Sequence, residues 1–453
     1  MRIKLLQNST LNNIREIFGY PRDANDTLLT HVTTDTRELQ VGDLFVGICG
    51  RSYDGASFTE HANKMGAFTL STSDKATIKA SSSEDILTKM ILYFKSRLSN
   101  LRYTVAITGS VGKTTTKELL LSLSENKFKS HASYQNYNNL VGLFHTLLSA
   151  PPDTELLICE LGMNATGEIL QMSRILSPDI AIITAIGNAH VGMLGSRERI
   201  AEAKLEITEG LKDSGTTVVP EDEPMLATAK NKFTFSMKSN HANAFFIPLR
   251  LDSGGTLFDY YSRGRSICGC RFNIAGEHNF HCLMGAFSAA VLLGITPREL
   301  NQRLYSINPS ILRQALLKIG SHTVYNDTYS SSPEAMLETM RMLTLYQMPL
   351  SAVLGDMLEL GDKSAYYHRS AGKRAALLGY KKLYLIGKNA RHTADGALVG
   401  GIKKENIHIN NSEALEETLS AIDKTYDGEI ILVKASHNAR LDRLVKMMME
   451  RWT

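Results

Sequence analysis

The sequence predicts an α/β protein in which helices cover parallel sheets. Short apolar, β-branched runs at 103–107, 156–159 and 180–184 alternate with segments of helical periodicity, a pattern typical of parallel sheets. The alternation begins again after residue 313, with apolar runs near Val324 and at 352–354, 383–386 and 430–433. A chain of 453 residues is also too long for one hydrophobic core. We therefore expect several domains, with two largely parallel sheets.

Changes of pattern divide the chain into three domains, and no internal repeat or low-complexity linker interrupts them. Residues 1–100 mix short strands with turn clusters such as Ser52-Tyr53-Asp54-Gly55. Residues 101–312 and 313–453 each carry one series of alternating strands and helices.

Helical periodicity places helices at 117–124, 197–211, 283–293, 332–346 and 412–422. Ser332 followed by Pro333 predicts a capped helix start, because serine accepts from free amides and proline suits the first helical position. The apolar positions of 197–211 share one face, and Lys204 falls on that same face.

Composition excludes some classes of protein. Hydrophobic residues make up 43% and charged residues 21%, the balance of an ordinary globular chain. Basic residues number 50 against 46 acidic ones, a net charge of +4 that gives no argument for nucleic acid or membrane binding. The N-terminus turns polar after two leucines, and no run reaches the ~18 apolar residues of a spanning helix. We expect no membrane segment, no nucleic acid partner and a cytoplasmic location.

Cysteine usage agrees with a reducing compartment. Cys268 and Cys270 could form half of a metal site, but no second pair at a suitable distance completes four ligands. We expect free thiols, as in a cytoplasmic protein. The five cysteines are Cys49, Cys159, Cys268, Cys270 and Cys282.

A glycine-containing loop at 108–115 joins a predicted strand to a predicted helix. Gly109 and Gly112 let the backbone curl, so that successive N–H groups point at phosphate oxygens beside a helix N-terminus. Lys113 would reach the outer phosphates, and the Thr114 hydroxyl would bind Mg²⁺. A purely structural turn is the alternative. The expected ATP-binding residues of the loop are Gly109, Ser110, Val111, Gly112, Lys113, Thr114 and Thr115.

The loop is shorter than the usual P-loop, because Ile107 stands where the first glycine of that pattern would be. In this it resembles the ATP loop of the Mur ligases, which build the peptide stem of the bacterial cell wall. Further motifs that resemble the family run through the whole chain. They are Thr34-Asp-Thr-Arg37, Gly42-Asp-Leu-Phe45, Asp54-Gly55, Asn136-Tyr-Asn-Asn139, Gly142, Glu160-Leu-Gly-Met163, Asn188-Ala-His190, Gly195-Ser196, Ala203-Lys204, Gly276-Glu-His-Asn279, Arg313, Asp327, the string 355–361 and His368.

The resemblance implies an architecture and an activity. Residues 1–100 would form a small mixed α/β domain that binds a UDP-linked substrate, 101–312 an ATP-binding domain with a P-loop-type parallel sheet, and 313–453 a Rossmann-like ligase domain. The chain would be a monomeric, ATP-dependent amide ligase of peptidoglycan synthesis, and so of cell-wall biogenesis, cell shape and cell division. Its reaction would pass through an acyl phosphate and release ADP. The string 355–361 most resembles the branch that adds D-alanyl-D-alanine to UDP-N-acetylmuramoyl-tripeptide.

Three residues are candidates to hold two Mg²⁺ ions together with Thr114. Glu160 ends an apolar run, which places a carboxylate at the edge of a parallel sheet where ligands collect. Its alternative is a surface glutamate. His190 follows a similar run and is by resemblance a second magnesium ligand. By resemblance Lys204 is carbamylated and holds the second ion, whereas the alternative is a lysine that extends its amine to water.

Other site residues come from the resemblance alone, and each could instead be a helix cap or an ordinary surface charge. Asn279 would contact adenine, although Cys282 stands where a second asparagine is usual. Arg313 would reach the ATP phosphates on domain closure and act in catalysis with Lys113, His190 and Lys204, while Asp327 would hold ribose hydroxyls. The residues expected to bind the UDP-linked substrate are Thr36, Arg37, Asp54, Asn138 and Asn139.

The predicted acceptor site departs from the usual pattern of its branch. Ser330 and Ser332 replace two asparagines, His437 replaces an arginine, and Leu312 replaces a glycine before Arg313. With Tyr329, these serines and His437 are the expected acceptor-binding residues. Serine cannot bridge the same partners as asparagine, and histidine is shorter and less charged than arginine. D-alanyl-D-alanine stays the first hypothesis. A paralogue that joins a different amine or dipeptide, and a nucleotide-binding protein without ligase activity, stay open.

Overall fold

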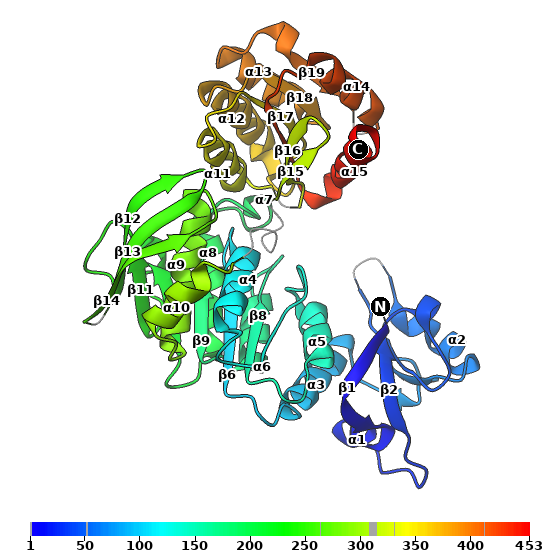
Figure 1. The fold of residues 1–453 in the computed structure, drawn as a ribbon. Coiled ribbons are helices and arrows are strands. Elements are labelled where there is room, and N and C mark those ends of the chain that lie inside the picture. Colours follow the sequence, from blue (N-terminus) through cyan, green and yellow to red (C-terminus); the bar gives the residue numbers. More distant parts are fainter. Residues whose placement is uncertain (1, 51–52, 263, 308–314, 330, 412) are drawn as a thin grey trace. The chain divides into compact units, whose positions relative to one another are not determined.

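The fold is α/β with three sheets, as the sequence predicts. The computed structural model describes all residues except 1, 51–52, 263, 308–314, 330 and 412 (Figure 1). The described chain forms two compact units, of which the first comprises Met1–Ala106, Ser124–Ala181 and Glu206–Gly215. The second comprises Ile107–Leu123, Ile182–Leu205 and Thr216–Thr453.

The N-terminal part contains a five-stranded sheet in the order β1-β2-β3-β4-β5. Strand β1 is antiparallel to β2, and the remaining neighbours are parallel. Phe45 and Val46 of β3 are almost fully buried and belong to the core of this domain. The elements are β1 (Arg2–Thr10), α1 (Leu11–Ile17), β2 (Leu28–Thr33), η1 (Thr36–Glu38), β3 (Leu44–Gly47), η2 (Gly55–Phe58), α2 (Thr59–Lys64), β4 (Phe68–Ser71), β5 (Ile78–Lys79) and α3 (Ser83–Ser96).

The nine-stranded sheet has the order β14-β13-β12-β11-β10-β9-β6-β8-β7. Strands β10 to β12 pair in parallel, whereas β12, β13 and β14 form an antiparallel extension. The strands are β6 (Tyr103–Thr108), β7 (Ser130–Ala132), β8 (Leu156–Glu160), β9 (Ile180–Ile183), β10 (Thr216–Pro220), β11 (Lys232–Ser236), β12 (Ala244–Asp252), β13 (Gly255–Ser262) and β14 (Arg265–Phe272). The helices are α4 (Lys113–Ser124), α5 (Leu140–Ser149), α6 (Glu168–Leu176), α7 (Val191–Leu194), α8 (Arg197–Leu205), η3 (Glu206–Gly210), η4 (Pro224–Leu226), α9 (Glu277–Leu292) and α10 (Pro297–Leu304).

The C-terminal sheet has six strands in the order β15-β16-β20-β17-β18-β19. Its central strands are parallel, and only the edge strand β15 is antiparallel to its neighbour. The strands are β15 (Ala315–Ile319), β16 (His322–Asp327), β17 (Leu350–Leu354), β18 (Lys382–Ile386), β19 (Ile407–Asn410) and β20 (Ile430–Lys434). The helices are α11 (Pro333–Thr344), η6 (Gly361–Lys363), α12 (Ser364–Leu377), α13 (Ala390–Val399), η7 (Lys404–Asn406), α14 (Leu415–Thr425), η8 (His437–Ala439) and α15 (Asp442–Trp452).

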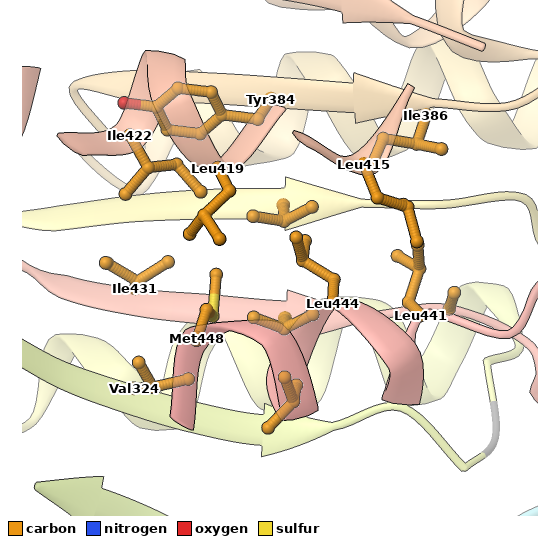
Figure 2. Close-up of a cluster of buried hydrophobic side chains, with 14 of the residues drawn as sticks. Val324, Tyr384, Ile386, Leu415, Leu419, Ile422, Ile431, Leu441, Leu444 and Met448 are labelled. Carbon is orange, nitrogen blue, oxygen red and sulfur yellow. The ribbon is translucent and has the colours of Figure 1, made fainter. Parts of the chain in front are cut away.

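Helices α14 and α15 cover one face of this sheet with a shared apolar cluster (Figure 2). Leu415, Leu419 and Ile422 recur at helical spacing on α14, so they lie on one face of that helix. Leu444 and Met448 do the same on α15. The sequence predicts a helix for α14, at 412–422, but not for α15.

Most predicted elements are confirmed, and the differences lie at helix ends. Ser332 caps α11 by accepting from the amide of Ala335, with Pro333 at the first helical position. The helix predicted at 283–293 begins earlier, at Glu277, and the one predicted at 117–124 begins at Lys113. The prediction at 412–422 corresponds to α14, with residue 412 outside the described residues.

The helix predicted at 197–211 is wrong beyond Leu205, where it continues as the 3₁₀ turn η3. Glu206 accepts hydrogen bonds from the amides of Gly167 and Leu170 near the start of α6. A Cβ at Gly210 would lie 2.2 Å from the carbonyl carbon of Ser173. This close packing against α6 accounts for the 3₁₀ turn in place of a regular helix. Because the contacts join segments distant in the sequence, hydrophobic periodicity does not predict them.

The five cysteines are free thiols, as expected. Within the described ranges, none of the helices has the length and apolarity needed to cross a membrane.

The end of the chain is held by a stack of aromatic rings. His322 on β16 lies between Tyr426 and Trp452, with ring centroids 4.1 and 3.8 Å away, and its plane is nearly parallel to that of Trp452. The Trp452 indole donates to Asp423, 2.6 Å away. Burial lowers the pKa of His322, although Asp423 and Glu429 oppose the shift. The imidazole is therefore neutral in the folded stack at neutral pH.

We predict that acid weakens this stack. Because the folded pKa of His322 lies below its unfolded value, its contribution to stability is complete above about pH 6.5 and falls as the pH drops from there through the folded pKa. Trp452 is the only tryptophan, so its fluorescence reports on the stack. We expect a fluorescence titration with a midpoint below 6.5 that His322→Phe removes. A midpoint at or above 6.5 would contradict the prediction.

Candidate active site

The phosphate loop follows the buried strand β6, and its two glycines allow close contacts. Gly109 has φ +149°, and a Cβ there would lie 1.9 Å from Thr184 Oγ1. Gly112 has φ +84°, and a Cβ there would lie 2.6 Å from Cys282 Sγ. Any side chain at either position would therefore collide with the floor of the loop, which Thr184 and Cys282 form.

Thr184, just after β9, fixes the loop through three contacts. Its hydroxyl donates to the carbonyl of Val111, and its amide donates to the carbonyl of Thr108, 2.9 Å away. Its own carbonyl lies 3.0 Å from His281 Nε2 on α9. The amide of Ser110 adds a bond to the carbonyl of Ala185. The loop is therefore preformed on the second unit.

Two lysines lie close to one another at this loop. The Lys113 ammonium donates to the carbonyl of Gly109, 2.9 Å away, so it folds back along the loop. Lys204 on α8 is 1% exposed, so it does not extend its amine to water. Burial and, to a lesser degree, the positive charge of Lys113 hold the pKa of Lys204 well below its ordinary value. Within the part of the chain that the structure describes, no carboxylate pairs with this amine. A buried amine without an anion favours the neutral form, which is the form that reacts with carbon dioxide.

Glu160 ends β8, as predicted, and is 3% exposed. Asn138 donates its side-chain amide to Glu160 Oε1, 3.2 Å away. The Asn138 carbonyl accepts from Gly162, where a Cβ would lie 2.8 Å from the asparagine side chain. Asn139 instead caps α5 by accepting from the amide of Gly142. Glu160 is thus a buried oxygen donor set in place by Asn138, and this chemistry suits Mg²⁺.

His190 is the cap residue just before α7 and has a left-handed conformation, with φ 68°. Its Nδ1 lies 2.7 Å from Glu359, and this contact lowers the pKa of the Glu359 carboxyl. Among the described residues, no three His, Cys, Asp or Glu side chains converge as a metal site. The roles expected of His190 and Thr114 as cation ligands stay predictions.

The residues expected to contact the nucleoside lie on α9 and at the end of β16. Asn279 lies inside α9 rather than before it, is 1% exposed, and donates to the carbonyl of Ala275. Gly276 occupies the cap position of this helix. Burial raises the pKa of the Cys282 thiol to about 12, which keeps it protonated beneath the loop. Arg313 and Leu312 lie outside the described residues.

Asp327 is buried in an ion pair that sequence reasoning missed. Its Oδ2 accepts from Lys434 Nζ at 2.6 Å and from the Thr339 hydroxyl at 2.8 Å. Lys434 ends the buried strand β20 beside Asp327 at the end of β16. A charge that ends an apolar run is the signal that marked Glu160, and the same signal marks Lys434.

Three of the five residues expected to bind the UDP-linked substrate lie in the N-terminal part, whereas Asn138 and Asn139 lie just before α5. Arg37 is exposed and pairs with Asp35, whose pKa this guanidinium lowers. Thr36 begins η1, and Asp54 caps η2 and accepts from the Cys49 thiol. Each already makes local contacts or begins an element, and their substrate roles stay predictions.

The structure brings two predicted acceptor residues together. The rings of Tyr329 and His437 lie 5.5 Å apart at an angle of 63°. Between them in the sequence, Ser332 uses its hydroxyl to cap α11. Ser436 accepts from the amide of Leu358 and donates to the carbonyl of Ser331. Ser330 lies outside the described residues.

Two family models match the chain. The Mur ligase middle domain matches residues 107–290, and the Mur ligase glutamate ligase domain matches residues 313–437. The first match contains the phosphate loop, Glu160, His190 and Lys204. The second contains Asp327, Lys434 and the Tyr329–His437 pair.

Relatives are similar over nearly their whole length. The UDP-N-acetylmuramoyl-tripeptide–D-alanyl-D-alanine ligase of Bacillus subtilis (strain 168) is 33% identical over 438 residues, which cover 94% of each chain. The enzyme of the same name from Synechocystis is 30% identical and covers 94% of this chain and 93% of its own.

Solved structures are similar in fold. A crystal structure of MurF from Acinetobacter baumannii has a TM-score of 0.88 and 24% identity, with 99% of this chain and all of that chain covered. MurF ligase from Thermotoga maritima in complex with ADP has a TM-score of 0.79 and 26% identity, with 93% and 97% covered.

We predict that Gly112→Ala weakens ADP binding at least ~30-fold. The left-handed φ costs an alanine about 1–2 kcal/mol, and the contact with Cys282 adds about 1–3 kcal/mol. Cys282→Ala in the same chain should recover the second part only. Calorimetric titration of ADP measures each affinity.

Gly294→Ala is the matched control, because Gly294 has φ +86° but no atom within 4 Å of the added Cβ. It should lower stability slightly and leave ADP affinity unchanged. Equal ADP affinity in Gly112→Ala and the wild type would show that ADP binding does not require glycine at position 112.

Proposed function

We propose, since the chain belongs to the Mur ligase family, that it is the ATP-dependent ligase that adds D-alanyl-D-alanine to UDP-N-acetylmuramoyl-tripeptide. The observation that carries the proposal is the similarity to enzymes of that name over 94% of this chain. The preformed phosphate loop also supports the proposal, because such an enzyme needs a site that binds the phosphates of ATP. The reaction belongs to peptidoglycan synthesis and would take place in the cytoplasm, where ATP is supplied, on small-molecule substrates and by a monomer.

An amide cannot form directly from a carboxylate, because its oxygen is a poor leaving group. Transfer of the γ-phosphoryl group of ATP to the carboxylate gives an acyl phosphate. The free amine then attacks the acyl carbon, the C–N bond forms, and phosphate leaves with the C–O bond electrons. Lys113 would stabilise the charge that develops on the transferring group, and Arg313 has the same expected role.

Magnesium fits the donors that the chain offers. The hydroxyl of Thr114, the buried carboxylate of Glu160 and His190 would hold it, together with Lys204 as a carbamate. When bound, the ions would neutralise phosphate charge during transfer. The carbamate forms when the neutral amine of Lys204 attacks carbon dioxide and loses one proton, which turns a buried base into a buried carboxylate.

The substitutions in the predicted acceptor site argue less strongly against D-alanyl-D-alanine than the sequence alone suggests. Ser332 serves as the cap of α11, and asparagine and serine cap helices about equally well. A serine here therefore keeps the helix start that an asparagine would give. His437 still faces the Tyr329 ring. We accordingly rank D-alanyl-D-alanine first and a related dipeptide second.

A nucleotide-binding protein without ligase activity is the other candidate. The chain keeps Lys113, Glu160, His190 and Lys204, and all four are half or fully buried. Retaining a buried unpaired lysine is costly, so a chain without catalysis would have little reason to keep it.

We predict that the protein releases phosphate from ATP only when UDP-N-acetylmuramoyl-tripeptide and an amine are both present. Among D-alanyl-D-alanine, D-alanyl-D-serine, D-alanyl-D-lactate and single amino acids, the first should give the highest kcat/KM. Lys113→Ala is the inactive control and should lose more than tenfold in kcat, which corresponds to over ~1.4 kcal/mol. Phosphate release without an amine, or a clear preference for another amine, would reject the proposal.

We predict that Lys204→Ala loses activity and that short-chain carboxylates partly restore it, because they replace the carbamate. Wild-type protein in bicarbonate should gain the mass of one carbon dioxide in native mass spectrometry, and Lys204→Ala should not. An unmodified amine in high-resolution density from bicarbonate-grown crystals would count against the carbamate.

A further inference from the structure

Two carboxylates from the C-terminal part of the chain lie against the loop that follows β9. Glu334, in the first turn of α11, accepts from the backbone amide of Asn188 at 2.9 Å and from its side-chain amide at 2.6 Å. Glu359 places Oε2 2.7 Å from His190 Nδ1. Both contacts lie within the second unit. The loop that carries the predicted magnesium ligand is thus held by groups more than a hundred residues away in the sequence.

The backbone at Gly192 lies so close to the backbone at 359–361 that there is no room for a side chain at Gly192. Gly192 donates its amide to the carbonyl of Glu359 at 3.1 Å, and a Cβ on Gly192 would lie 2.5 Å from the nitrogen of Gly361. Gly361 itself has φ +55°. This approach brings Glu359 Oε2 to His190 Nδ1, while about half of the glutamate side chain stays exposed to solvent.

Both partners adopt an unfavourable backbone conformation to make the contact. His190 has φ 68° and Glu359 has φ 63°, and neither is a glycine. Such conformations persist where the surrounding structure enforces them, and they collect at functional sites. The Nδ1 atom of His190 is also buried and lies 2.7 Å from the Glu359 carboxylate, although the two groups are not aligned as a regular hydrogen bond.

We propose that Glu359 is a positioning residue for the divalent cation site. A small turn of the ring would let the Nδ1–H of His190 donate to this carboxylate 2.7 Å away, which would fix the neutral tautomer whose Nε2 carries the lone pair. A histidine that binds a metal through one nitrogen commonly gives its other N–H to a carboxylate. The assignment of His190 as a cation ligand rests on the proposed function.

The contact has a consequence for how the site forms. Glu359 belongs to the string 355–361, whereas His190 follows β9 of the nine-stranded sheet. The histidine is therefore oriented for a cation only while these segments meet. Glu334 holds the same loop through Asn188, which adds a second point of attachment.

Nuclear magnetic resonance of ¹⁵N-histidine-labelled protein tests the tautomer without a metal. His190→Gln identifies the signal. In the wild type we expect a protonated Nδ1 and an unprotonated Nε2, and in Glu359→Ala a mixture of tautomers. Glu359→Gln should keep the wild-type tautomer, because its amide oxygen still accepts. The control is Asp362→Ala, an exposed carboxylate three residues further on in η6, which should change nothing.

Titration of Mn²⁺ in the presence of ADP gives the second readout. Glu359→Ala should bind Mn²⁺ 10- to 100-fold more weakly, roughly the loss expected when the partner of a ligating histidine is removed. The inference is overturned if Glu359→Ala keeps the wild-type tautomer and Mn²⁺ affinity, or if Asp362→Ala changes both as much. Lack of ligase activity in the wild type would reject the proposed function instead, and the tautomer measurement does not depend on that result.

Discussion

The close packing of the phosphate loop against Thr184 and Cys282 is the constraint on which the rest of the site depends. Gly109 and Gly112 press against Thr184 and Cys282 at distances that admit no Cβ. The amide and hydroxyl of Thr184 bond to the loop, and its carbonyl contacts His281 on α9. The loop conformation is therefore determined by β9 and α9 as much as by its own glycines. A preformed cradle for phosphate spares the ordering cost that a flexible loop would have at the moment of binding.

Burial of charge is the second theme of the structure. Lys204 is buried without a carboxylate partner among the described residues, whereas Lys434 and Asp327 are buried as a pair. A paired buried charge is satisfied by its neighbour, and removing one partner would leave the other uncompensated. An unpaired one must change its ionisation or its chemistry. The two lysines therefore differ in kind. Lys434 is structural support for Asp327, and Lys204 is available for modification.

Sequence patterns predict features that depend on local periodicity. Glu160 is found because it ends a buried apolar run, Asp327 is found by resemblance, and the burial of Lys204 agrees with its place on the apolar helix face. The start of α9 is missed because polar residues such as Asn279 are buried there, which hides the apolar periodicity. The glycine requirement of the loop is predictable, but its partners Thr184 and Cys282 are not. Contacts such as Glu359 with His190 join distant segments and leave no periodic signal.

The position of Cys282 beneath the phosphate loop suggests what the cysteine does there. By resemblance an asparagine is usual there, and its absence suggests a lost contact to adenine. In the structure the Cys282 thiol lies beneath Gly112, and the Thr116 hydroxyl lowers its pKa slightly against the larger effect of burial. An asparagine side chain is larger and more polar than a thiol, so at this position it would press on the loop or turn aside. The substitution therefore acts first on the shape of the phosphate seat, and any effect on the base follows from how that seat holds the nucleotide.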